Sequence, residues 1–241
     1  MARPTITDAN CPEANCPEAS CPDANCQRCP RLVALRGNCR ASHPDWHNAP
    51  VPSLGDPDAR LLIIGLAPGR QGANRTGRPF TGDAAGGYLF DMLCRHGLAS
   101  GTYHPDGNDD IRLRDVRITN AVRCLPPDNK PVAAEVNNCR PFLASEIEGM
   151  PRLDTILTLG RLAHDATCRC LGFRPSEIPF GHGHIWQGKT RQWQQQQQRQ
   201  RLRLVSSYHC SRYNTQTGRL TDAMFTRIFA DIKSGWAARL D

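Results

Sequence analysis

One loop gathers the residue types that best suit ligand chemistry. It covers residues 65–83 and reads GLAPGRQGANRTGRPFTGD. Glycines let the backbone approach a ligand closely, and the two prolines, Pro68 and Pro79, limit the freedom of the loop. The loop follows the apolar run LLII, so it leaves the carboxyl end of an expected strand at 60–65, where open α/β sheets place their ligand sites. We interpret the loop as the centre of a binding or catalytic site.

The charge balance allows a polyanionic partner. The chain of 241 residues carries a formal net charge of +7, and lysine occurs only at positions 130, 189 and 233. Guanidinium groups suit bidentate phosphate contacts, so the arginine bias favours nucleic acid. An arginine-rich composition without any such role explains this single feature equally well.

The apolar content indicates a protein outside the membrane. No run reaches the roughly 20 apolar residues of a membrane span, and the first residues lack the apolar core of a signal peptide. We therefore expect a cytoplasmic protein. In that compartment twelve cysteines are better explained by metal or cluster ligands than by structural disulfides.

The amino-terminal segment is a short repeat. Cysteines recur every five residues at Cys11, Cys16, Cys21 and Cys26, each of the first three followed by proline. This period matches neither helix nor strand, so we predict a disordered leader at 1–25 and a single folded domain at 26–241. A metal-binding tail is the sharper alternative for the leader.

The remaining pattern predicts an α/β fold. An amphipathic helix follows the CxxC at 26–29, an irregular segment covers 37–58, and a glutamine-rich, solvated loop covers 192–200. Strands are expected at 60–65, 116–124, 155–160 and 202–207, and helices after them at 84–97, 132–149, 161–170 and 221–234. Four β-then-α units imply a three-layer α/β/α sandwich around a four-stranded parallel sheet.

Four cysteines form a candidate metal site. Cys26 and Cys29 lie at CxxC spacing, and Cys124 and Cys139 lie at the end of the second expected strand and in the next helix. Four thiolates suit either tetrahedral zinc or a [4Fe-4S] cluster, and their spacing does not separate the two. Cys21 or Cys39 is an alternative ligand for one of the four positions.

Several motifs together resemble a known family. The runs GLAPG at 65–69, NRTGRPFTGD at 74–83, ITNAVRC at 118–124, HCS at 209–211 and NTQTGRLT at 214–221 resemble the family 5 (type b) uracil-DNA glycosylases. The resemblance runs in order from Cys26 to the last helix. It implies a four-stranded parallel sheet between helices and hydrolysis of the N-glycosidic bond of uracil and other deaminated bases, such as hypoxanthine and xanthine, in DNA. It also implies a structural [4Fe-4S] cluster bound by Cys26, Cys29, Cys124 and Cys139.

The resemblance also suggests the catalytic groups. Relatives with a carboxylate or amide in the GxxPG loop use it to handle water, but this chain has Ala67 there. By resemblance, Asp83 takes over, with Asn129 as a second candidate. Asp83 is also placed to cap the helix that begins at Ala84. His209, at the end of the last strand, is expected to donate a hydrogen bond to the departing base.

Other residues are expected to hold the base and the DNA. A glycosylase flips its target nucleotide into a pocket, where Phe80 would stack on the base and Asn120 would offer an amide to the uracil edge. We expect Arg75, Arg78, Ser211 and Arg212 to contact DNA, and residues 210–213 to enter the minor groove. The expected protein is a monomer that binds DNA containing uracil or other deaminated bases, with no membrane contact.

Two other functions compete with this one. A non-catalytic iron-sulfur or zinc module that binds DNA is favoured by the missing polar side chain at Ala67. A relative that crosslinks the abasic sugar to a histidine would need an inserted basic loop, and none occurs between Phe80 and Ala85.

Overall fold

The computed structural model describes residues 21–191 and 202–237. The predictions for most of the leader and for the glutamine-rich loop at 192–200 fall outside these residues.

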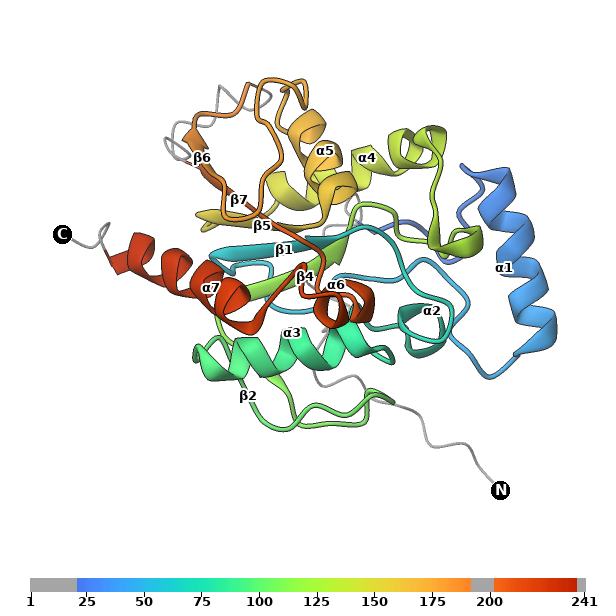
Figure 1. Ribbon diagram of the computed structural model, residues 1–241. Helices are drawn as coiled ribbons and strands as arrows, with labels where there is room; N and C mark the ends of the chain where they lie inside the picture. The colour runs from blue at the N-terminus through green and yellow to red at the C-terminus, as the bar shows by residue number, and fades with distance from the viewer. Residues whose placement is uncertain (1–20, 192–201, 238–241) are drawn as a thin grey trace.

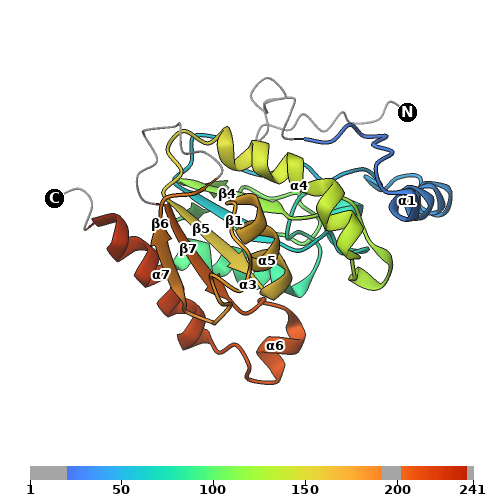
Figure 2. The same ribbon diagram turned by 90° about the horizontal axis from the view of Figure 1, so that it is seen from above.

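A five-stranded sheet forms the middle layer of the protein. Its strands lie in the order β4 (Val116–Asn120), β1 (Leu61–Gly65), β5 (Thr155–Leu159), β7 (Leu202–Ser207) and β6 (Ile185–Gly188), as Figure 2 shows from above. β4, β1, β5 and β7 are parallel, which confirms the four predicted parallel strands. β4, predicted at 116–124, ends at Asn120. The prediction of a four-stranded sheet is incomplete, because β6 adds an antiparallel edge. This strand alternates exposed and half-exposed residues and has no apolar run to reveal it.

Helices cover both faces of the sheet, which confirms the three-layer prediction (Figure 1). α3 (Ala84–Arg95) and α7 (Asp222–Ala237) pack on one face, and α4 (Ala133–Glu148) and α5 (Arg161–Cys170) pack on the other. Side chains of β1 alternate between these layers. Leu61 and Ile63 join the core under α3 and α7, whereas Leu62 and Ile64 join the core under α4 and α5.

α1 (Pro30–Ser42) stands outside the layers, at the right in Figure 1. It continues through residues that the sequence predicts to be irregular from 37 onward, so that boundary was wrong. Gly37 lowers helix propensity by about 1 kcal/mol, but tertiary contacts on both sides outweigh this cost. Cys39 is buried, and the Arg40 guanidinium donates hydrogen bonds to the carbonyl oxygens of Asn48 and Ala24.

The short elements lie in the connections. They are α2 (Ala73–Thr76), the 3-10 turn η1 (Pro127–Asn129), α6 (Arg212–Gln216) and a small hairpin of β2 (Ala99–Ser100) and β3 (Arg112–Leu113). None was predicted as a separate element, because each is too short to show a period in the sequence. Among the helices of the described residues, none has the length and apolar content needed to cross a membrane.

A buried ion cluster fixes α4 to the sheet. The Glu146 carboxylate accepts hydrogen bonds from Arg117 on β4 and from Arg123 just beyond it, and Ser53 Oγ donates to the same carboxylate at 2.6 Å. Burial alone would raise the pKa of Glu146, but the two guanidinium groups hold it below its usual value. The backbone N–H of Arg123 also donates to Cys139 Sγ at 3.3 Å, so this cluster adjoins the predicted ligand cysteines.

Candidate active site

A cavity of about 330 Å³ lies at the carboxyl end of the parallel strands. We call it the strand-end cavity. Loops that follow β1, β4 and β7 supply its walls, as expected where parallel strands end at one edge. Seven residues singled out in the sequence line it together: Ala67, Phe80, Asp83, Asn120, Asn129, His209 and Ser211.

Gly65, the last residue of β1, leaves room for two of the lining side chains. A Cβ added there would lie 2.4 Å from Asn120 Oδ1 and 2.8 Å from Phe80 Cζ. Real Cβ atoms do not approach this closely, so only glycine permits both side chains to occupy their positions. Asn120 is itself the last residue of β4 and is buried. Its side chain therefore lies against the end of the adjacent strand β1.

Phe80 has an unusual backbone that directs its ring into the cavity. Its φ angle is +52°, in the left-handed region that non-glycine residues rarely adopt, and its side chain is buried. Its carbonyl lies so close to Gly86 in α3 that a Cβ at Gly86 would lie 1.7 Å from the oxygen. The ring position thus depends on a glycine in the first turn of α3.

Asp83 caps α3 with one carboxylate oxygen. Its Oδ1 accepts a hydrogen bond from Gly86 N at 2.9 Å, which confirms the predicted N-cap. The other oxygen, Oδ2, faces the glycine loop: added Cβ atoms at Gly72 and Gly69 would lie 3.1 Å and 3.6 Å from it. Asp83 is solvent-exposed, so a fixed carboxylate oxygen is reachable from the cavity.

His209 lies beside Phe80 in the wall of the strand-end cavity. The two ring centroids are 6.0 Å apart and the ring planes differ by 23°. Asn214 Nδ2 donates to the His209 carbonyl at 2.8 Å, and Gly160 at the end of β5 packs against its Cβ. Burial lowers the pKa of His209 below its usual value, and the Asp83 carboxylate opposes that shift. The imidazole is therefore neutral near pH 7 and offers one N–H donor.

Asn129 and Ala67 complete the walls. Asn129 ends the η1 turn with φ +55°, after Asp128 with φ +52°, and its side chain is exposed. Ala67 presents a methyl group to the cavity, and the same residue packs against the small core of Leu32, Val122 and Cys139. Ala67 therefore connects the strand-end cavity to the cysteine region.

The segment after His209 forms the rim of the cavity. Ser211 accepts a hydrogen bond from Asn214 N and caps α6, while Arg212 and Tyr213 are exposed, Tyr213 with 71% of its surface accessible. Cys210 is 1% exposed and its thiol faces the Ala85 carbonyl. The predicted minor-groove segment at 210–213 is thus wrong at its first residue, because Cys210 belongs to the core.

Arg75 and Arg78 lie outside the strand-end cavity. Arg75 donates to the carbonyl oxygens of Gln71 and Pro105. Arg78 is 2.8 Å from Asp109 Oδ2 and its guanidinium lies over the Phe90 ring. The DNA contacts predicted for these two arginines are untested, but both side chains already bind neighbouring loops.

The four predicted ligand cysteines line one second cavity, which we call the cysteine cavity. Cys26 and Cys29 come from the segment just before α1, Cys124 from the segment after β4, and Cys139 from α4. Leu32, Val33, Val122 and Phe142 supply apolar walls. Polar hydrogens point at the sulfurs: Asn138 Nδ2 lies 3.7 Å from Cys29 Sγ and Arg36 Nη1 lies 3.9 Å from Cys124 Sγ.

The four thiols are a donor set that an iron-sulfur cluster can use, because in a [4Fe-4S] cluster each of four thiolates binds a different iron. The hydrogen-bond donors beside Cys29 and Cys124 are of the kind that supports such ligands. Within residues 21–191 and 202–237, no three or more His, Cys, Asp or Glu side chains are grouped closely enough to hold one metal ion.

Some residues around the site carry no signal in the sequence. Tyr103, whose hydroxyl accepts a hydrogen bond from Gly82 N, and Asp109, which pairs with Arg78, both lie in a polar stretch without a motif. Asn214 belongs to the NTQTGRLT run, but its contact with the His209 carbonyl depends on the turn into α6.

Comparison with known proteins gives a consistent result. The model of the uracil DNA glycosylase superfamily matches residues 52–233. A curated relative from Thermus thermophilus, named type-5 uracil-DNA glycosylase, is 44% identical over 211 residues, which are 85% of this chain and 91% of the relative. A protein of the same name from Pyrobaculum aerophilum is 40% identical over 80% of this chain and 81% of its own length. A type-4 uracil-DNA glycosylase from Archaeoglobus fulgidus is 38% identical over 66% of this chain and 69% of its own length.

Proposed function

Because this chain belongs to the uracil-DNA glycosylase superfamily and, within it, to the type-5 enzymes, we propose that it hydrolyses the N-glycosidic bond of uracil in DNA and leaves an abasic site. The observation that carries the proposal is the strand-end cavity, where a fixed carboxylate, an imidazole donor, an aromatic ring and a buried amide meet. The net charge of +7 suits a polyanionic substrate.

In this proposal the flipped base lies between Phe80 and Asn120. The Phe80 ring offers a stacking face, and the Asn120 amide accepts from uracil N3–H and donates to O4. Hypoxanthine and xanthine present the same pair of a ring N–H beside a carbonyl, which we propose extends the substrates to these deaminated purines. Asn120 ends β4 beside the end of β1, so its backbone position is set before the base binds.

Asp83 holds the water that attacks the sugar. The cap to Gly86 N fixes Oδ1, so Oδ2 is left to accept a hydrogen bond from water. Glycines at 69 and 72 leave space beside that oxygen, since side chains there would crowd it. The exposed amide of Asn129, on the opposite loop, is the second group proposed to orient this water. A carboxylate near the sugar also stabilises the positive charge that develops there.

His209 stabilises the departing base. Bond cleavage places negative charge on the base, and the neutral imidazole donates its N–H to O2 of the uracil anion. The lowered pKa of His209 keeps the ring neutral in the free enzyme. Asn214 holds the His209 backbone, so the donor is in place before charge develops.

Ser211, Arg212 and Tyr213 contact the DNA around the flipped nucleotide. Ser211 lines the strand-end cavity, and Arg212 and Tyr213 follow it on α6 with exposed side chains. An aromatic ring inserted into the stack fills the gap that flipping leaves. Arg212 and the Ser211 hydroxyl suit neighbouring phosphates.

The cysteine cavity is proposed to hold a [4Fe-4S] cluster bound by Cys26, Cys29, Cys124 and Cys139. Such a cluster would join α1, α4 and the segment after β4 covalently, and so would brace the loops that carry Ala67 and Asn129. Thiolate ligands fit the reducing cytoplasm, where we place the protein. We also propose that the enzyme is a monomer.

The test is base release from oligonucleotides that carry uracil, hypoxanthine or xanthine opposite each normal base. We expect free uracil and an abasic product, with slower release of the two purines. Binding of uracil-containing DNA without any abasic product would instead support a non-catalytic DNA-binding module, the alternative favoured by the methyl group of Ala67. Visible absorbance and iron and sulfide analysis of protein purified without oxygen test the cluster.

A further inference from the structure

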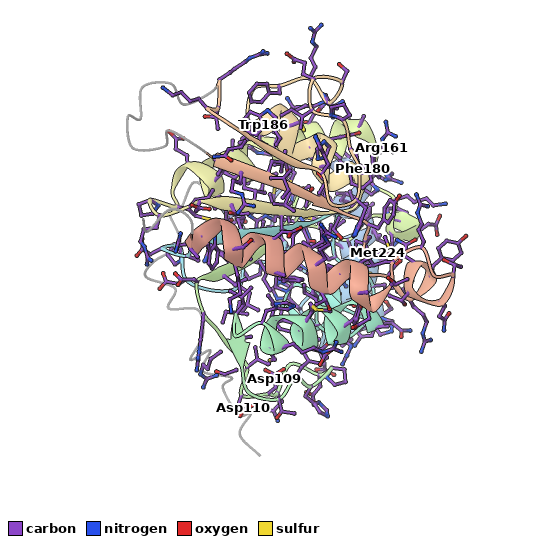
Figure 3. The ribbon with its side chains drawn as sticks, turned by 60° about the vertical axis from the view of Figure 1, so that its left-hand side comes forward. Asp109, Asp110, Arg161, Phe180, Trp186 and Met224 are labelled. Carbon is purple, nitrogen blue, oxygen red and sulfur yellow. The ribbon has the colours of Figure 1, made fainter. Side chains whose placement is uncertain are left out.

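The loop at 101–111, between β2 and β3, packs along the loop that carries Phe80 and Asp83. Figure 3 labels Asp109 and Asp110 on it, below α3 in that view. Three residues of the loop at 65–83 make these contacts. Arg75 donates to the Pro105 carbonyl, Arg78 pairs with Asp109, and Gly82 donates its N–H to the Tyr103 hydroxyl. The last two contacts lie on either side of Phe80.

Tyr103 is held firmly at this contact. Its hydroxyl accepts from Gly82 N at 3.1 Å, and its ring stacks on Phe90 of α3 with centroids 5.0 Å apart. The hydroxyl lies so close to α3 that a Cβ at Gly86 would be 2.9 Å from it. Tyr103 therefore touches both the residue before Asp83 and the turn that Asp83 caps.

Asp109 organises the other half of the contact. Its side chain is 2% exposed, and Oδ2 accepts from Arg78 Nη1 at 2.8 Å and from His104 N at 3.0 Å. Oδ1 accepts from Ile111 N at 3.2 Å. The carboxylate thus fixes its own loop and the Arg78 side chain at once.

The backbone between these two contacts needs such support. Phe80 has φ +52° and Gly82 has φ +95°. A non-glycine residue in the left-handed region persists only where its surroundings determine it. Arg78 and Gly82 flank Phe80, and both contact the loop at 101–111. These contacts therefore hold the backbone of Phe80 in its left-handed conformation.

We propose that Tyr103 and the Asp109–Arg78 pair are positioning residues for glycosidic cleavage, which hold Phe80 and Asp83 in their working geometry. The proposal rests on the roles of Phe80 and Asp83 proposed above. Arg78 then acts inside the protein rather than on a phosphate.

The first test is Tyr103→Phe, which keeps the ring on Phe90 and removes only the acceptor for Gly82 N–H. We expect the single-turnover rate of uracil excision to fall about tenfold, because small displacements of a reacting group are costly. Affinity for undamaged duplex, which depends on the rim, should stay within about twofold. The matched control is Tyr88→Phe on α3, which removes a hydroxyl 3.4 Å from Asp222 away from the cavity and should leave the rate unchanged.

The second test is Asp109→Asn, compared with Asp222→Asn, which weakens the exposed ion pair between Asp222 of α7 and Arg95 of α3. We expect only Asp109→Asn to slow excision. Tyr103→Phe should also have a much smaller effect in an Asp83→Asn background, because the two changes act on one unit.

Each result has one meaning. Equal rates for Tyr103→Phe and Tyr88→Phe overturn the positioning role, whereas a full tenfold effect of Tyr103→Phe in the Asp83→Asn background overturns its action through Asp83. Rate losses that disappear when variants are compared at equal distance below their unfolding temperatures also overturn the positioning role, since they report only stability. Full activity of Asp83→Asn and Phe80→Ala would instead refute the site roles in the proposed function.

Discussion

The two cavities adjoin each other through Ala67 but are built in different ways. The strand-end cavity is lined by both apolar and polar residues at strand and loop ends, and its Asp83 and Asn129 are exposed to solvent. The cysteine cavity is lined by four thiols and apolar side chains, together with Arg28, Arg36 and Asn138, and its Cys139 and Leu32 are buried. Asp83 and Asn129 can be changed without removing core contacts, whereas Cys139 and Leu32 cannot. Substitutions should therefore separate rate from stability.

The largest effect on rate is expected for Asp83→Asn. The asparagine amide oxygen still caps α3, but the carboxylate is lost. We expect the single-turnover rate to fall by about 10²–10⁴-fold, the range for removal of a positioned base, with little change in melting temperature. Asp83→Ser is the matched control for the cap, and it should lose the same activity. A rate near that of the unchanged protein would remove Asp83 from the chemistry.

His209→Ala should come next. Loss of a hydrogen-bond donor to the developing anion typically costs about 10²–10³-fold in rate. His182→Ala serves as a control, because that ring stacks on Tyr208 beside the same strand end but does not line the strand-end cavity. Comparable losses in both variants would indicate damage to the strand end rather than loss of the donor.

Cys139→Ser tests the expectation that changes in the cysteine cavity affect stability. The change removes a proposed cluster ligand from a buried position, so visible absorbance should fall and the melting temperature should drop. The melting temperature of a chain of this size falls by about 2–4 °C for each kcal/mol of lost stability. We expect a drop of several times that amount. Cys170→Ser is the control, since that thiol is buried under α4 and α5 outside the cysteine cavity. Equal absorbance in both variants would contradict the ligand assignment.

The smallest effect is expected at acidic pH, where the whole fold, and with it both cavities, should lose stability. His164 is fully buried, with Ser206 Oγ at 2.9 Å from Nδ1 and the Ile178 carbonyl at 2.7 Å from Nε2, and burial lowers its pKa. The folded state then binds fewer protons than the unfolded chain. Its contribution to stability is present above pH about 6.5 and is lost as pH falls toward the lowered pKa. Chemical unfolding between pH 7.5 and 5 measures this decline, and His164→Gln should flatten it. An unchanged slope in that variant would assign the decline to other groups.

Much of the fold was predictable because apolar runs and glycine-rich ends mark buried parallel strands. β1, β5 and β7 and the helices after them follow these signals closely. The family resemblance was confirmed by the comparisons. The motifs also identified seven lining residues of the strand-end cavity, although they come from segments more than 140 positions apart, such as Ala67 and His209.

The parts that sequence reasoning missed depend on tertiary partners. β6 exists because β7 offers it an edge. Arg78 in its motif looks like a phosphate ligand, yet its partner Asp109 lies in a polar loop with no pattern of its own. Cys210 sits among exposed rim residues in the sequence, but its side chain turns into the core beside Ala85.

The close packing at Gly65 has a consequence for how the range of bases can change during evolution. No Cβ fits at this position beside the Asn120 and Phe80 side chains, both of which line the strand-end cavity. A larger residue at 65 would therefore displace the two side chains proposed to contact the base. New base preferences must therefore arise from Asn120, or from replacements in the loops that form the mouth.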